Sequence, residues 1–421
     1  MYSLYLHIPF CLHRCAYCDF NTYAGQEALI PAYLDALCNE IRAVASSAPE
    51  RLPVHTIFFG GGTPSLLAPK QFEQILRTFH DHFDLSEPET SLEANPGTVT
   101  LASLRDLRRI GFNRISFGIQ SAHPDELRQL ERIHNFFDVI NSVKWARQAG
   151  FDNLNLDLIF GLPEQSLDRW QATIRSALVL HPEHLSLYAL TLEHGTPFGR
   201  WAARGLLPTP DPDLAAEMYE WVMDYLAGQG YIQYEISNWA RTKDEGGRRK
   251  AEENFHPSSF ILSPSYACLH NLTYWRNQTY LGFGAGAHGY AAGVRYSNVL
   301  RIKTYIERCH SSLVTRHSFP LSPATVNYHH ITPKTEMQET MFTSLRLTRE
   351  GVSADVFRKR FGVELQEVFG KETDELVALG LLEWVEEKTL PQVPGPAGGS
   401  RLLLTPRGRL LGNQVFMRFV D

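Results

Sequence analysis

Short apolar runs alternate with amphipathic stretches over the first 240 residues. The apolar runs have the length of buried β-strands and cover 3–8, 54–59, 90–94, 113–119, 154–160, 185–190 and 231–236. Apolar residues recur at helical spacing in 71–83, and again in 101–110, which Gly111 would end as a C′ glycine. Repeated βα units of this kind predict an α/β fold with a parallel sheet, either open or curled toward a barrel.

The pattern changes after residue 240. The stretch 241–267 begins with the charged run RTKDEGGRRKAEE, which predicts an inserted surface loop. Helical patterns return from about 335, and short strands at 382–385 and 401–404 flank a predicted turn at 391–400. Helices followed by a β-hairpin favour a small winged-helix-like α+β domain, a kind that binds DNA or other proteins. We therefore expect a sheet domain, an inserted loop, a connecting region and a C-terminal domain, over 1–240, 241–267, 268–330 and 331–421.

Charge and hydropathy bear on whether the protein binds nucleic acid or spans a membrane. The chain has 421 residues, of which 40 are basic and 46 acidic, so its net charge is −6. Nucleic-acid binding usually requires a basic excess, and we therefore expect no nucleic acid as principal partner. No apolar run reaches the roughly 18 residues of a membrane span, and no basic leader precedes an apolar segment. We expect a cytoplasmic protein, and peripheral membrane contact stays open.

Three of the six cysteines lie within eight positions, as Cys11, Cys15 and Cys18. A structural zinc ion normally has four protein ligands, and a four-iron cluster also needs four, so this spacing leaves one coordination position open. An iron–sulfur cluster with one open iron is the favoured interpretation, and the alternatives are a zinc site and a coincidental grouping of cysteines. Either thiolate site needs a reducing compartment. The other cysteines are isolated and are interpreted as buried or incidental thiols, at positions Cys38, Cys268 and Cys309.

Glycine and polar residues follow the predicted strands. The run Gly60-Gly61-Gly62-Thr63-Pro64 comes directly after the strand 54–59, where glycine lets the backbone approach a ligand closely. Polar side chains stand at or after the next strands, namely Glu93, Arg114, Ser116, Gln120, Arg132 and Asp157. Each alone is as compatible with a capping or ion-pair role as with ligand binding. Together they favour a site at one mouth of a barrel.

These strings carry a resemblance to a known family. The chain resembles the radical S-adenosylmethionine (SAM) superfamily, and within it the oxygen-independent coproporphyrinogen III oxidase family, most of all its heme chaperone branch. The matching strings are CLHRCAYC, GGGTP, SLEANPGT, RISFGIQS, RIHN, DLIFGLPEQ, HNLTYW, YLGFGAGAHGY and ETMFTSLRLTREGV. The resemblance implies a partial (β/α)6 barrel followed by a smaller C-terminal domain.

The resemblance also implies a site. Cys11, Cys15 and Cys18 would hold a [4Fe–4S] cluster whose fourth iron is chelated by SAM. The turn Gly61-Gly62-Thr63 would line the methionine part. Further positions match residues that contact SAM in the oxidases, which can hold two SAM molecules; they are Tyr5, Tyr17, Glu93, Gln120, Arg132 and Asp157.

Two features separate the branches of the family. The oxidases carry a further cysteine after the triplet, where this chain has Phe20. HNLTYW resembles a heme-binding signature of the chaperone branch, in which His270 would ligate heme iron, with His288 as a lesser candidate. The alternative role for His270 is that of a helix- or turn-capping side chain.

Three functions follow from these features. The favoured one is a heme chaperone that carries a SAM-liganded cluster and passes heme to an acceptor protein, such as a respiratory enzyme. The second is an oxygen-independent coproporphyrinogen III oxidase, which converts two propionates to vinyl groups. The third is a zinc-stabilised binding module without radical chemistry.

Overall fold

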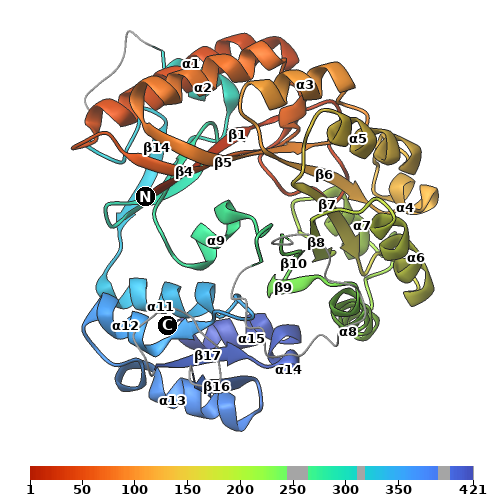
Figure 1. The fold of residues 1–421 in the computed structure, drawn as a ribbon, viewed down its shortest axis with the longest axis vertical. Coiled ribbons are helices and arrows are strands. Elements are labelled where there is room, and N and C mark those ends of the chain that lie inside the picture. The colour runs from red at the N-terminus through yellow and green to blue at the C-terminus, as the bar shows by residue number, and fades with distance from the viewer. Residues whose placement is uncertain (244–263, 311–317, 387–398, 421) are drawn as a thin grey trace. The chain divides into compact units, whose positions relative to one another are not determined.

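The described residues form two compact units, each built from two separate stretches of the chain (Figure 1). The computed structural model describes residues 1–243, 264–310, 318–386 and 399–420. The first unit contains Met1–Val222 and Thr279–His330, and the second contains Met223–Gln278 and Ile331–Asp421. The predicted inserted loop at 241–267 lies mostly outside the described residues, as does most of the predicted turn at 391–400.

Parallel strands form the centre of the first unit, in the order β1-β4-β5-β6-β7-β8. Their bounds are β1 Tyr2–Ile8, β4 Pro53–Gly61, β5 Asp84–Ala94, β6 Arg114–Gln120, β7 Leu154–Phe160 and β8 His184–Ala189. Each contains or overlaps a run predicted from the apolar pattern. Helices follow the strands in the chain, as α1 Ile30–Ser47, α2 Pro69–His82, α3 Leu101–Arg109, α4 Pro124–Gln129, α5 Phe136–Gln148, α6 Leu167–Leu178, α7 Pro197–Ala203 and α8 Pro212–Gly228. The predicted partial (β/α)6 barrel is confirmed, with α1, α2, α3, α5 and α6 on the outside of the curved sheet (Figure 1).

Aromatic packing joins sheet and helices as the apolar spacing predicts. Phe72 of α2, Phe59 of β4 and Phe112 form a cluster with ring centroids 5.1–5.2 Å apart. All three are fully buried, and each such side chain contributes about 1.5–3 kcal/mol through removal of apolar surface from water. Gly111 follows α3 with φ +115°, a conformation that disfavours any side chain, so its predicted place after the helix is confirmed.

The first unit extends beyond its parallel strands. β11 (Tyr280–Phe283) pairs parallel with β1, and β12, β13 and β14 then add antiparallel strands. The other elements of this part are β2 Phe10–Cys11, β3 Tyr23–Ala24, β12 His288–Ala291, β13 Val294–Asn298, β14 Thr325–His330 and α10 Ile302–Arg308. The structure thereby divides the predicted connecting region 268–330, because HNLTYW belongs to the second unit and GAGAHGY to the first.

The second unit begins at Met223, within α8, and continues with a hairpin. The strand expected over 231–236 is present as β9 (Ile232–Glu235), but it pairs antiparallel with β10 (Asn238–Ala240) instead of continuing the parallel series. The two residues between these strands suit a hairpin, whereas a parallel neighbour needs a crossover of a dozen or more residues. The helix α9 (Leu269–Trp275) carries the motif HNLTYW and packs against α11.

The C-terminal part of the second unit has the expected winged-helix-like order of helices and strands. The elements are α11 Pro333–Ser344, β15 Val352–Ser353, α12 Ala354–Phe361, α13 Leu365–Ala378, β16 Leu382–Glu386, β17 Ser400–Leu404, α14 Pro406–Leu410 and α15 Gly412–Phe416. Their strands form a sheet in the order β15-β17-β16 over a core that includes Met341, Phe357 and Leu402.

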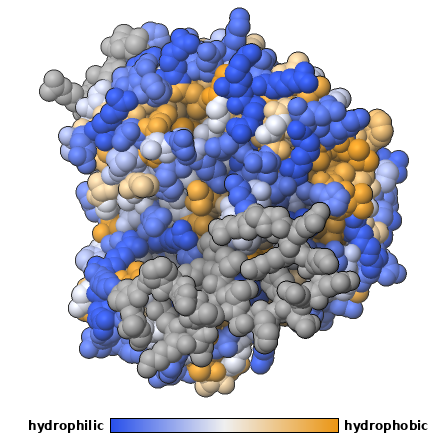
Figure 2. Space-filling model, in the orientation of Figure 1, coloured by the Kyte–Doolittle hydropathy of each residue, from blue (hydrophilic) through white to orange (hydrophobic). Residues whose placement is uncertain are grey.

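The hydropathy of the surface is seen on one face of the molecule in Figure 2. Hydrophilic residues predominate on the face seen in Figure 2, with smaller hydrophobic areas between them. Among the residues that the structure describes, no helix is both long and apolar enough to cross a membrane.

Candidate functional site

The three clustered cysteines lie on a loop that is closed at both ends. Cys11 ends β2, which pairs parallel with β3 at the other end of the loop. Cys11 is buried, whereas Cys15 and Cys18 are partly accessible. The three thiols are close enough that the charges of Cys15 and Cys18 raise the pKa of Cys11, although burial is the larger cause. The loop thus holds three sulfur donors within electrostatic range of one another.

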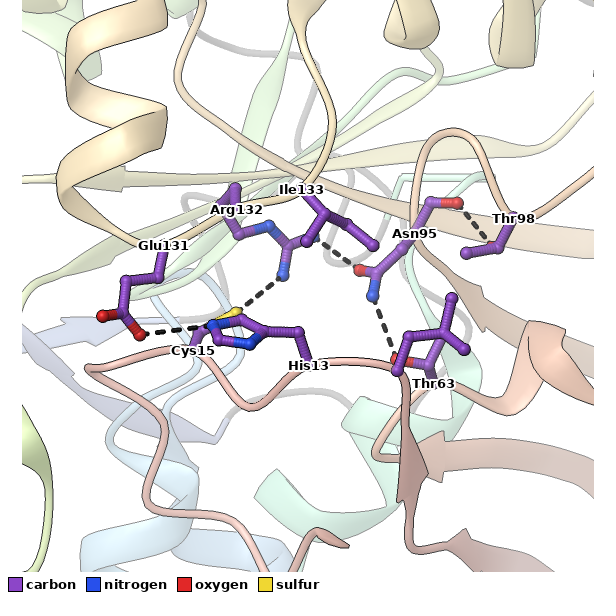
Figure 3. A pocket seen from close by; sticks show the side chains of 9 residues that line it. His13, Cys15, Thr63, Asn95, Thr98, Glu131, Arg132 and Ile133 are labelled. Atoms are coloured by element: carbon purple, nitrogen blue, oxygen red, sulfur yellow. Dashed lines mark hydrogen bonds and ion pairs between the residues drawn. The ribbon is translucent and has the colours of Figure 1, made fainter. Parts of the chain in front are cut away.

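A chain of hydrogen bonds connects two of these thiols through three sequence motifs, and Figure 3 shows the part of it from Cys15 to Thr63. The guanidinium of Arg132 donates to Cys15 Sγ at 3.5 Å and to Asn95 Oδ1 at 2.5 Å. Asn95 Nδ2 donates to Thr63 Oγ1 at 3.0 Å, and Thr63 Oγ1 donates to Cys11 Sγ at 3.6 Å. RIHN, SLEANPGT and GGGTP are therefore parts of one site, and a small pocket lies against Cys15, Thr63, Asn95 and Arg132.

The glycine turn after β4 leaves no room for side chains. A Cβ atom on Gly62 would lie 2.6 Å from the carbonyl oxygen of Phe10, next to the first cysteine. Gly61 has φ +110°, and its N–H donates to Glu93 Oε2 at 3.1 Å. The turn therefore brings bare backbone against both the cysteine loop and the end of β5, as its sequence predicts.

Two carboxylates face the interior of the barrel. Asp157 Oδ2 accepts from Ser116 Oγ at 2.7 Å and Oδ1 accepts from Asn155 Nδ2 at 2.7 Å. Burial and the nearby Asp157 charge raise the pKa of Glu93 to about 7. Burial also raises the pKa of Asp157, while its hydrogen bonds from Ser116 and Asn155 oppose that rise. Asp157 has more donors than Glu93, so the negative charge of the pair resides preferentially on Asp157.

The remaining predicted residues of the first unit lie around this centre. Tyr17 is adjacent to Arg132, whose charge opposes the rise in the Tyr17 pKa that burial causes. The hydroxyl of Tyr5 lies 3.0 Å from His7 Nδ1. Gln120 ends β6 in the left-handed region with φ +63°, and its amide lies beside Gly118. Among the site residues predicted in the first unit, Gln120 thus ends its strand. Tyr5 and Asp157 lie in the middle of β1 and β7, whereas Tyr17 and Arg132 lie on loops.

Several residues of the site were missed by sequence reasoning. Asn95 stands inside the quoted string SLEANPGT, and its position directly after β5 was the available signal. His7 is hydrogen-bonded at both ring nitrogens, because Nε2 donates to the carbonyl oxygen of Asn21 at 2.9 Å and Nδ1 lies 3.0 Å from the hydroxyl of Tyr5. Asn21 Nδ2 in turn donates to the carbonyl oxygen of Ala285 at 3.0 Å. This tertiary contact anchors the cysteine loop to the GAGAHGY segment, and no local pattern predicts it.

The predicted heme ligand is in a different environment. His270 lies on α9 of the second unit, is 1% exposed, and its Nε2 is 2.9 Å from the hydroxyl of Tyr274. Iron ligation through Nε2 would require this hydrogen bond to break. His288, the lesser candidate, is exposed on β12 of the first unit. Burial lowers the pKa of His7, and the nearby His288 lowers it further. The isolated Cys38, Cys268 and Cys309 are buried, as expected.

The donor set suits a group with several metal atoms. The cysteine loop supplies three thiols, and iron–sulfur clusters prefer thiolate ligands. In the described part of the chain, no three His, Cys, Asp or Glu side chains are close enough together to hold a single metal ion.

Comparison with known proteins places the chain in a family. A profile of the Radical SAM superfamily matches residues 5–177, and one of the HemN C-terminal domain matches 331–387. The heme chaperone HemW of Bacillus subtilis is 38% identical over 100% of this chain and 99% of that protein. The chain belongs to the HemW family.

Other relatives agree with this placement. Escherichia coli HemW is 39% identical over 68% of this chain and 69% of that protein. The structure of the radical SAM enzyme coproporphyrinogen III oxidase (HemN) from Escherichia coli superposes with a TM-score of 0.76, covering 99% of this chain and 89% of that one at 23% identity. That likeness concerns the fold, which HemW proteins therefore share with HemN.

Proposed function

We propose that this protein is a heme chaperone, which binds heme, carries a SAM-liganded [4Fe–4S] cluster and passes the heme to an acceptor protein. The observation that carries the proposal is identity with named heme chaperones along the whole chain, 38% in the Bacillus subtilis case. The zinc-module alternative has no support from these relatives.

Cys11, Cys15 and Cys18 are the proposed ligands of the cluster. Burial raises the pKa of the Cys11 and Cys18 thiols, so their deprotonation accompanies metal binding in this proposal. The Arg132 guanidinium beside Cys15 and the hydroxyl of Thr63 beside Cys11 would stabilise thiolate charge. When bound, the cluster and SAM supply one-electron chemistry at the sulfonium group.

The proposed SAM site lies next to these thiols. The bare backbone of the glycine turn would admit the methionine part, and the two carboxylates would accept hydrogen bonds from hydroxyl or amino groups. The residues we assign to this site are Tyr5, Tyr17, Gly61, Gly62, Thr63, Glu93, Gln120, Arg132 and Asp157, together with Asn95. We propose no division of these residues between one and two SAM molecules.

Heme binding is proposed to use His270 of the HNLTYW motif. The imidazole is already hydrogen-bonded, so ligation would exchange the Tyr274 partner for iron. Phe20, which is 64% exposed, stands where the oxidases have a cysteine, and this favours the chaperone function over oxidase activity.

The acceptor is proposed to be a respiratory enzyme. Such an acceptor would bring the protein to the cytoplasmic face of a membrane as a peripheral protein. Co-sedimentation of the heme-loaded chain with membranes, compared with protein-free vesicles of the same lipids, would test this contact.

Two assays on anaerobically reconstituted protein test the proposed function. Heme titration should give stoichiometric binding with a shifted Soret band. Incubation with coproporphyrinogen III, SAM and a reductant should give no vinyl product above background. Turnover by the wild-type chain would replace the chaperone proposal with the oxidase alternative.

A further inference from the structure

A polar network lies behind Asp157 in the interior of the first unit. The strand registers place Ser116, Asn155 and His184 in one row across β6, β7 and β8. Asp157 lies one row nearer the carboxyl ends, because alternate residues of a strand share a face. The side chains in the lower row are at most 5% exposed, whereas Asp157 reaches accessible surface. Asp157 is therefore the point at which the buried network reaches solvent-accessible surface.

The hydrogen bonds of this network are donated from His184 to Asn155 and from Asn155 to Asp157. Asp157 is an acceptor, so Asn155 must present its Nδ2 to Asp157, and the distance to Oδ1 is 2.7 Å. The carbonyl Oδ1 of Asn155 then faces His184, whose Nδ1 lies 2.6 Å away. Only a protonated Nδ1 can donate to that oxygen. His184 is thus required as the Nδ1–H tautomer, and Ser186 Oγ adds a second donor to Asn155 Oδ1 at 3.2 Å.

Electrostatics keeps His184 neutral in this role. The ring is fully buried, and desolvation together with the charge of Arg114 holds the pKa of His184 well below its ordinary value. A neutral imidazole keeps its Nδ1–H at physiological pH without adding a positive charge beside the carboxylate. Asp157 therefore keeps full acceptor strength toward a ligand.

We propose that His184 is a positioning residue that acts through Asn155 to hold the carboxylate of Asp157 in the orientation that accepts hydrogen bonds from SAM. This inference rests on the proposed function, in which Asp157 contacts SAM. A fixed carboxylate can accept hydrogen bonds from both members of a neighbouring pair of hydroxyl groups, as on a ribose.

Paired substitutions separate the donor role from a packing role. His184→Asn keeps an N–H at the position of Nδ1, whereas His184→Leu fills similar space without a donor. Thr56→Val is the matched control, since it removes a buried 2.6 Å hydrogen bond to Ser3 on β1 and β4, away from Asp157. SAM affinity is measured on the anaerobic, cluster-loaded protein by titration and by the change in the EPR spectrum of the reduced cluster, with iron content and thermal unfolding recorded for each variant.

We expect His184→Leu to weaken SAM binding about tenfold, the effect of one hydrogen bond to a charged group. His184→Asn should restore most of that affinity, and Thr56→Val should lower thermal stability with unchanged SAM affinity. Equal SAM affinity in His184→Leu and wild type, or equal losses in His184→Leu and Thr56→Val, would overturn the positioning role. Failure of the wild type to bind SAM would instead refute the proposed function, so the two failures are distinguishable.

Discussion

The strand-end motifs of the first unit and the HNLTYW helix of the second unit were both predicted to bind ligands. Their side chains differ in how accessible they are in the structure. In the first unit, motifs separated by 117 residues meet, as the Arg132–Cys15 hydrogen bond shows. The accessible faces of Glu93 and Asp157 remain open there, with their hydrogen-bonded partners behind them. In the second unit, His270 is buried with Tyr274 as partner.

This difference shows what the parallel sheet contributes. Neighbouring parallel strands have their carboxyl ends at the same edge of the sheet. Polar residues that follow successive strands therefore lie close together. A short helix offers no such rule, because its surroundings decide which side chains stay accessible. The first site is therefore preformed, whereas heme ligation by His270 has to displace an existing interaction.

Removal of the cluster ligands should produce the largest effect. Changing any one of Cys11, Cys15 or Cys18 to Ala should reduce iron from about four per monomer to near zero, because no other thiol lies on the loop. Iron and labile-sulfide assays on anaerobic protein provide the measurement. Cys38→Ala, at a buried and isolated cysteine, should retain iron. Stoichiometric zinc without labile sulfide in the wild type would contradict the assignment.

Loss of a barrel carboxylate should weaken SAM binding while iron stays. Asp157→Ala removes an acceptor held by Ser116 and Asn155, and we expect a 10- to 100-fold loss in affinity from about one or two hydrogen bonds to a charged group. Titration followed by EPR on reduced, cluster-loaded protein measures it. Asp125→Ala, which removes an exposed carboxylate paired with Arg169, should leave SAM affinity unchanged. Equal behaviour of the two variants would remove Asp157 from the site.

Heme binding should respond to both members of the His270–Tyr274 pair. His270→Ala should shift the heme absorbance and lower affinity about tenfold or more, through loss of an axial imidazole. Tyr274→Phe should tighten heme binding several-fold, because ligation no longer has to break the 2.9 Å hydrogen bond. Heme titrations monitored at the Soret band measure both.

Two further variants sharpen the contrast between the two units. His288→Ala should leave the heme spectrum unaltered, and a variant lacking all three cluster cysteines should still bind heme, since different residues form the two sites. An unshifted spectrum in His270→Ala combined with a shifted one in His288→Ala would move the ligand to the first unit.

Glu93 should make the stability of the fold depend on pH. Its pKa is raised by burial and by Asp157 to about 7 in the folded protein, against an ordinary 4.5. The unfolded chain therefore loses this proton first as pH rises, so the folded state is penalised progressively between pH 4.5 and 7, by at most about 3 kcal/mol. Glu93→Gln, which keeps an acceptor for Gly61, should unfold at a higher temperature than wild type at pH 8 and at a similar one at pH 5. A constant difference in Tm across this range would contradict the raised pKa.

Much of the first unit could be predicted because its signals are local. Strand runs such as 54–59 and the glycine run after them depend on side-chain size and backbone freedom, which each residue carries with it. The role of Asn95 could not be predicted, since it depends on Arg132 arriving from another strand-end loop. The strand 231–236 was placed correctly, but its antiparallel pairing was not predicted, because that pairing depends on the short turn to β10. The burial of His270 likewise depends on neighbours from distant sequence.

The division of the first unit into two stretches of chain has a consequence for biosynthesis. β1 is made first, but its neighbour β11 begins at Tyr280, after the segment Met223–Gln278 of the second unit. Synthesis proceeds at about 5–20 residues per second, so β11 is made roughly 15–55 s after β1. One edge of β1 stays unpaired with β11 during that time. The residues linking Cys15 to Cys11 through hydrogen bonds have all emerged by Arg132, whereas the Asn21 contact with Ala285 forms only near the end. A nascent chain can therefore assemble its thiol site long before the contact that fastens the cysteine loop is available.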